Sequence, residues 1–102
     1  MSIFKNISDA ETAINKLVPL LVRGINRLKK VEVDNFRQYS NDPDNTYYVD
    51  VTFYVDGESF DRELSSKFLH IKERLLEDIK RYIGVTLISN SSRVTTLNSN
   101  LK

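Results

Sequence analysis

One stretch of this chain alternates more strictly than any other. It runs from Thr46 to Val55 and reads TYYVDVTFYV, with an apolar residue at every second position from Tyr47 onward. This period is typical of a β-strand that buries one face, and β-branched and aromatic residues fit a pleated surface. A shift of one residue in the pairing would carry Asp50 and Thr52 into the core. We therefore expect a strand here whose register is strongly specified.

A long amphipathic helix is expected soon after this strand. From Leu64 to Ile83 apolar residues recur at spacings of three and four with charged residues between them, which is the period of a core-facing helix. Leu69, Leu76 and Tyr82 widen this apolar stripe. Gly84 follows directly and suits a helix C-cap, because glycine readily adopts positive φ. Strand and helix are expected to bury their apolar faces against each other.

A first helix is expected to begin at the capping box Ser8–Glu11, where Ser8 would accept a hydrogen bond from the amide of Glu11. The apolar stripe that follows consists of Ala10, Ile14, Leu17, Leu21, Ile25 and Leu28. Because the stripe stays in phase across Pro19, we predict one kinked helix that runs to Lys29. The run LVPLLV around Pro19 is apolar on nearly all sides, so it needs two partners. Either the sheet and the second helix cover both sides, or one side meets another subunit.

A further strand is expected before the strongly alternating one. Lys30–Tyr39 is predicted to form it, and a β-bulge near Asp34–Asn35 would bring Phe36 into phase with Val31 and Val33. The turn residues SNDPDN follow, so this strand and the one after it should pair antiparallel.

After the second helix, Val85–Ile88 is predicted to form a short strand. Asn90–Ser92 is expected to turn the chain, and Val94–Leu97 to form a weak edge strand.

These elements predict an α+β two-layer sandwich in the order helix, strand, strand, helix, strand, with a further strand as an option. The sheet should be small and mostly antiparallel, with two helices on one face. The length of 102 residues suits a single domain. Its core is expected within residues 8–88, and residues 89–102 should form a weak edge strand or a tail that a partner orders.

The composition narrows the class of protein. The net charge is +1 and there is no cysteine, so disulfide frameworks and thiolate metal sites are excluded. The longest apolar run, Leu17–Val22, is too short to span a membrane. We expect a cytoplasmic protein with no membrane partner.

No residue pattern indicates catalysis. The single histidine, His70, has no nucleophile motif around it, and three glycines are too few for a phosphate-binding loop. We therefore expect no enzyme activity, no catalytic residue, no cofactor, no bound metal and no small-molecule substrate.

Association with protein is the function that the surfaces favour. Tyrosine is enriched in interfaces, and the polar face of the Thr46–Val55 strand carries two tyrosines beside Thr52. Together with the apolar helix around Pro19, this gives a set of candidate interface residues. They are Val18, Leu20, Val22, Tyr48, Thr52 and Tyr54. We expect a non-enzymatic structural or assembly protein, a homo-oligomer that binds itself or other assembly components.

A nucleic-acid-binding module is the alternative. Four basic residues gather near the end of the first helix, namely Arg23, Arg27, Lys29 and Lys30. Tyr48 and Tyr54 would then stack bases, as in sheet-based RNA readers. Basic residues at a helix end are also expected from the helix dipole alone.

The order of four stretches resembles that of small tail-completion (tail-terminator) and neck proteins of tailed phages. The stretches are SDAETAINKLVPLLVRGINRL, TYYVDVTFYV, FDRELSSKFLHIKERLLEDI and VTLI, within residues 8–88. The resemblance implies a ring-forming, non-enzymatic virion component that caps or joins tail parts. Such a protein would be found in the host cytoplasm or in the virion.

Overall fold

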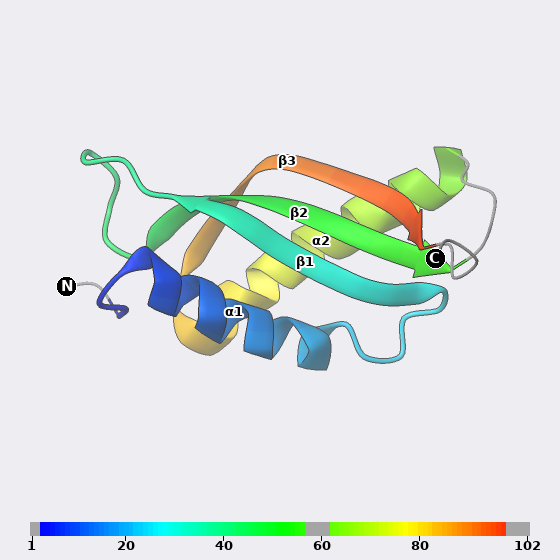
Figure 1. The fold of residues 1–102 in the computed structure, drawn as a ribbon, viewed down its shortest axis with the longest axis horizontal. Helices are drawn as coiled ribbons and strands as arrows, with labels where there is room; N and C mark the ends of the chain where they lie inside the picture. The colour runs from blue at the N-terminus through cyan, green and yellow to red at the C-terminus, as the bar shows by residue number, and fades with distance from the viewer. Residues whose placement is uncertain (1–2, 57–61, 98–102) are drawn as a thin grey trace.

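We describe the protein from a computed structural model, over residues 3–56 and 62–97. The chain forms α1 (Ile7–Leu21), β1 (Leu28–Arg37), β2 (Thr46–Asp56), α2 (Arg62–Ile83) and β3 (Thr86–Leu97) (Figure 1). The predicted order of elements is confirmed.

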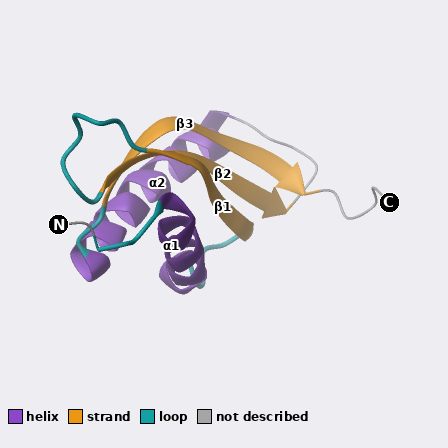
Figure 2. Ribbon diagram, turned by 60° about the vertical axis from the view of Figure 1, so that its left-hand side comes forward, coloured by secondary structure: helices purple, strands orange, loops and turns teal. Residues whose placement is uncertain are grey.

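The three strands form one sheet in the order β1-β2-β3. β1 and β2 pair antiparallel, as predicted, whereas β2 and β3 pair parallel because α2 carries the chain back across the sheet. Figure 2 shows both helices on one face of the sheet, and no described helix lies on the other face. The α+β two-layer architecture is thus confirmed, and the sheet itself is mixed.

The core lies between this sheet and the two helices. All five apolar residues of one face of β2, from Tyr47 to Val55, are buried, as the alternation predicts. Phe53 meets Phe68 of α2 with ring centroids 5.4 Å apart. The helices contribute a buried row each, Ala10, Ile14 and Val18 from α1 and Phe68, Leu75 and Ile79 from α2.

α2 ends where the sequence predicts. Gly84 has a φ of +71° and donates its N–H to the carbonyl of Lys80 at 2.8 Å, so it caps the helix. The apolar stripe is narrower than expected, however, because Leu69 and Tyr82 are exposed.

α1 differs from the prediction at both ends. It begins at Ile7, and the side chain of Asn6 rather than Ser8 caps it by accepting a hydrogen bond from the amide of Asp9. It ends at Leu21 rather than near Lys29. Pro19 offers no N–H to the helix, and Gly24 (φ +81°) then adopts a left-handed conformation that turns the chain toward β1.

β1 contains the predicted bulge. Asn35 has a φ of +53°, and the pairing with β2 shifts between Asp34 and Arg37. Phe36 is buried as a result. In the predicted turn, the carboxylate of Asp42 accepts a hydrogen bond from the amide of Tyr39.

β3 is longer than predicted. The expected turn at Asn90–Ser92 is wrong, because β3 continues through it to Leu97. The register shifts there, since Ser89 pairs with Val49 and Ser91 pairs with Asp50, so Asn90 is the extra residue of a bulge. Residues 98–102 of the predicted tail lie outside the described part of the chain.

Candidate protein interface

The first candidate surface is the apolar end of α1. Pro19 and Leu20 lie on the surface, and 62% of Leu20 is exposed. Val22 and Ile25 beyond them are half-buried against the core. The helix ends at Leu21, two residues after the proline, while its apolar pattern continues, which leaves these side chains at the rim of the protein.

Two hollows flank this end of α1. The first, which we call the β1 hollow, lies between α1 and β1 and has a volume of about 600 Å³. The second, the interhelical hollow, lies between the end of α1 and α2 and measures about 330 Å³. Val22 and Ile25 line both hollows, so the turn after α1 forms the ridge between them.

The prediction that Val18 belongs to the interface is wrong. Val18 is completely buried, because it follows Ala10 and Ile14 at intervals of four and so faces the core. Leu20 points to solvent and Val22 lines the hollows. The surface therefore consists of Pro19, Leu20, Val22 and Ile25.

The second candidate surface is the sheet face without helices, which carries Tyr48, Thr52 and Tyr54. Thr52 is also a correction, since only 5% of it is exposed. It is the central residue of a row across the sheet, paired with Glu32 of β1 and with Arg93 of β3.

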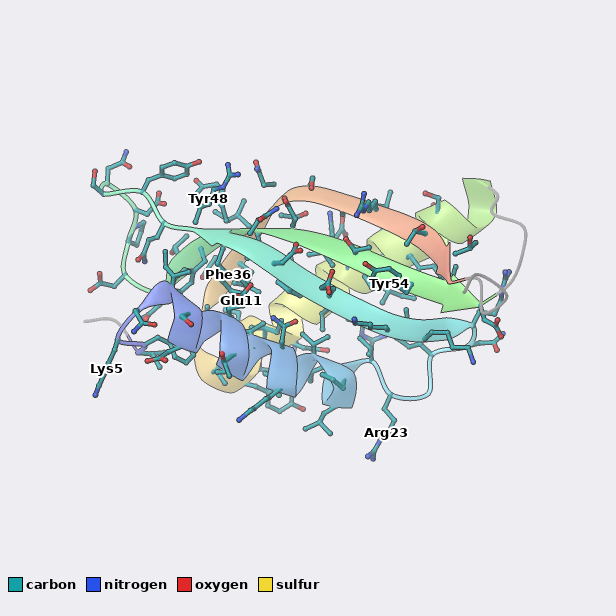
Figure 3. The ribbon with its side chains drawn as sticks, viewed as in Figure 1. Lys5, Glu11, Arg23, Phe36, Tyr48 and Tyr54 are labelled. Carbon is teal, nitrogen blue, oxygen red and sulfur yellow. The ribbon has the colours of Figure 1, made fainter. Side chains whose placement is uncertain are left out.

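Both tyrosines of this face are half-buried and engaged with neighbours. The rings of Tyr48 and Tyr39 meet edge to face, 5.1 Å apart. Tyr54 donates its hydroxyl to Glu32 at 3.3 Å, and the ammonium of Lys30 lies 5.5 Å from its ring centroid. Figure 3 shows the two tyrosines well apart along β2. The tyrosines of this face are already engaged in contacts within the chain. The apolar end of α1 is therefore the stronger interface candidate.

A hydrogen-bonded triad crosses all three strands on the same face. The carboxylate of Asp50 accepts hydrogen bonds from the amide of Asn35 at 2.6 Å and from the hydroxyl of Ser91 at 2.8 Å. Each donor sits at a bulge, one in β1 and one in β3. These bonds hold the pKa of Asp50 below its usual range. Asp34 has the opposite shift, since burial and the nearby charges of Glu32 and Asp50 raise its pKa.

Three of the four basic residues, Arg23, Lys29 and Lys30, line the β1 hollow, and three of the four, Arg27, Lys29 and Lys30, are engaged with neighbouring groups. Arg27 donates two hydrogen bonds to the carbonyl of Asp56, and Lys29 lies 3.8 Å from the carboxylate of Asp56. Lys30 lies 3.6 Å from the carboxylate of Glu32. Arg23 extends away from the body of the protein (Figure 3). Arg27 and Lys29 thus join the start of β1 to the end of β2.

One functional side chain was not predicted from the sequence. Asn15 of α1 donates a hydrogen bond to the carbonyl of Val33 at 2.8 Å and accepts one from the amide of Val33 at 3.2 Å. Asn15 also donates to the carbonyl of Glu11 at 2.9 Å. Asparagine has a low helix propensity, so its presence within the predicted helix was the feature of the sequence that could have indicated a specific hydrogen-bonding role.

Comparison of the chain with protein-family models, curated proteins and solved structures finds no match. Among the described residues, no helix is long and apolar enough to cross a membrane. What the protein does is therefore inferred from the surfaces above.

Proposed function

We propose that this protein is a non-enzymatic subunit of a homo-oligomeric assembly, which acts through protein–protein contacts. The observation that carries the proposal is the apolar end of α1. There Leu20 is 62% exposed beside hollows of about 600 and 330 Å³.

This arrangement suits a contact between subunits. Interfaces derive most of their binding energy from a few side chains that fill pockets and become fully desolvated. Here Leu20 supplies an anchor, and the hollows lined by Val22 and Ile25 supply the receiving surface. Because anchor and hollows lie at the same end of α1, the neighbouring subunit covers both at once.

We further propose that the assembly is a phage tail or neck part. This part of the proposal rests on the order of elements, α-β-β-α-β, which the resemblance to tail-completion and neck proteins implies. In that role the protein works in the host cytoplasm or in the virion.

Sedimentation velocity of the purified protein, from micromolar to millimolar concentrations, tests the proposal. We expect concentration-dependent oligomers. Leu20→Glu should weaken association by about tenfold or more, because it places a charge in a desolvated contact. Thr12→Glu is the matched control, since Thr12 is also exposed on α1 and the charge change is the same.

A strict monomer over the whole concentration range, with no protein recovered in pull-downs from the producing cell, would overturn the proposal. Equal weakening by Leu20→Glu and Thr12→Glu would show that the apolar end of α1 is not the contact.

A further inference from the structure

The outer edge of β3 has backbone groups directed away from the sheet. Val33 of β1 uses its N–H and C=O on Asn15, so its antiparallel neighbour Val51 directs its own groups to β3. In a parallel pair, the N–H and C=O of a residue bond the two residues on either side of its partner. Val51 therefore bonds the residues on either side of Ser92, and Phe53 bonds those on either side of Val94. The N–H and C=O of Ser92 and Val94 therefore face outward.

Little along β3 discourages another strand from pairing. β3 has 12 residues, and Arg93 is the only charged residue in it. It contains no proline, and proteins commonly use charges, prolines or a covering segment to protect such an edge. The bulge at Asn90 lies in its first half, so Ser91–Leu97 is an uninterrupted segment.

The same side of the protein presents apolar surface from α2. Ile71, Arg74 and Asp78 face α1, because they line the interhelical hollow. Successive residues of a helix are rotated by about 100° around its axis. Leu69 and Leu76 therefore lie on the opposite side of the buried row from Ile71, Arg74 and Asp78, and face β3. Leu69 is 43% exposed, and Figure 1 shows the first turns of α2 beside β3.

We propose that a second copy of this chain binds this edge, with β3 antiparallel to the partner's β3 about a two-fold axis at Val94. Two three-stranded sheets would then join into one of six strands. The α2 helices would approach each other beneath it and cover Leu69. The inference rests on the proposed function and names one contact between the subunits.

A second copy fits this surface better than an isolated peptide strand does. The axis at Val94 places Ser92 opposite the partner's Thr96, so groups that face outward meet groups that face outward. Arg93 lies opposite the partner's Thr95, so the two arginines are not directly opposed. An isolated strand would bond the backbone but leave Leu69 in solvent, whereas a second copy brings both a strand and a helix.

Cysteine cross-linking tests the pairing and its register, since the chain has no cysteine of its own. Residue 93 and the partner's residue 95 would form a pair without backbone hydrogen bonds, with Cα atoms about 4.5 Å apart, within reach of a disulfide. Identical residues would lie diagonally at about 7–8 Å, beyond that reach. Under oxidised glutathione, a mixture of Arg93→Cys and Thr95→Cys chains should form disulfide-linked dimers, whereas each chain alone should not.

Equal cross-linking in the single-variant samples, or none in the mixture, would overturn the inference. A monomer at every concentration would overturn it too, whether or not another protein uses this edge. A dimer that survives with a different cross-linking pattern would leave the proposed function intact and reject this contact.

A pair of α2 variants gives an independent readout. Leu69→Lys should weaken the dimer by about tenfold, because it places two charges beside the two-fold axis. Tyr82→Lys, at the far end of the same helix and 66% exposed, should leave the dimer unchanged. Equal effects of the two substitutions would contradict the proposed contact.

Discussion

The two edges of this sheet are built differently. At the β1 edge, α1 lies alongside the strand and Asn15 bonds both backbone groups of Val33. At the β3 edge, the described residues place neither a helix nor a side chain on the outward groups of Ser92 and Val94. Asn15 thus satisfies the outward groups of one β1 residue, and the described residues offer no such side chain to Ser92 or Val94 of β3.

Asn15 shows how a helix residue can satisfy the outward backbone groups of an edge strand. Its side-chain amide has the donor and acceptor of a peptide group, so it takes the place of one residue of a fourth strand. Within α1 such a residue lowers helix propensity slightly, and the bonds to Val33 offset that cost. The bonds to Val33 depend on one side chain, so a single substitution tests them.

Removal of Asn15 should have the largest effect on stability. Asn15→Ala leaves the amide and carbonyl of Val33 without partners, and should lower the free energy of unfolding by about 2–3 kcal/mol. Urea denaturation measures this. Lys16→Ala, at an exposed neighbouring position, is the control and should change stability by less than about 0.5 kcal/mol. A similar small change for Asn15→Ala would mean that the β1 edge does not need this bond.

A substitution that blocks strand pairing at the β3 edge should have the next largest effect. It should weaken dimerisation without changing the folding of the monomer. Ser92→Pro removes an outward N–H, and its symmetric loss in both chains should raise the dimer dissociation constant about thirtyfold. Proline is tolerated on an edge strand when the N–H faces outward, so the monomer should stay folded by circular dichroism. Ser92→Ala keeps the amide and is the control. An unchanged dissociation constant in folded Ser92→Pro would count against the β3 contact.

A smaller effect is expected at Asp50, which ties the bulges of both edge strands together. Asp50→Asn should lower the free energy of unfolding by about 1 kcal/mol at neutral pH, because charge-assisted bonds from Asn35 and Ser91 are weakened. The pKa of Asp50 is lowered in the folded state, so its contribution is complete above the ordinary value of 3.8. It is lost as pH falls through the lowered pKa. The wild-type and variant stability curves should therefore converge in acid, and a gap that persists there would refute the assignment.

The smallest effect is expected at Asp34. Burial and the charges of Glu32 and Asp50 raise its pKa, so the folded state disfavours its ionised form. Its contribution is the reverse of that of Asp50, since stability is lost as pH rises from 3.8 through the raised pKa. Asp34→Asn should raise stability at neutral pH by up to about 0.5 kcal/mol, a figure reduced for solvent screening at this half-buried site. Thermal unfolding at neutral pH measures it, and a lower melting temperature would be the contrary result.

The elements predicted correctly are those whose residue pattern directly reflects which side is buried. β2 alternates because one face meets two helices, α2 repeats because one side meets the sheet, and Gly84 supplies the positive φ at its cap. The bulge at Asn35 was also predictable, because Phe36 needed it to reach the core.

The wrong predictions concern residues whose structure or burial depends on segments distant in the sequence. β3 has a Ser/Thr/Asn-rich middle with little apolar alternation, and it is a strand because β2 pairs with it along its whole length. Thr52 is buried in the central strand, between Glu32 and Arg93 in register, and the sequence of β2 alone does not show these neighbours. The stripe of α1 continued to Leu28, but Gly24 turned the chain before that residue could join the helix.

Backbone hydrogen exchange by NMR over a dilution series tests the central claim most directly. The amide of Val33 should exchange at the same slow rate at every concentration, because Asn15 protects it within the chain. The amides of Ser92 and Val94 should exchange rapidly in dilute protein and become protected as dimers form. Exchange at Ser92 and Val94 that does not change with concentration, in a sample that sedimentation shows to dimerise, would contradict the account.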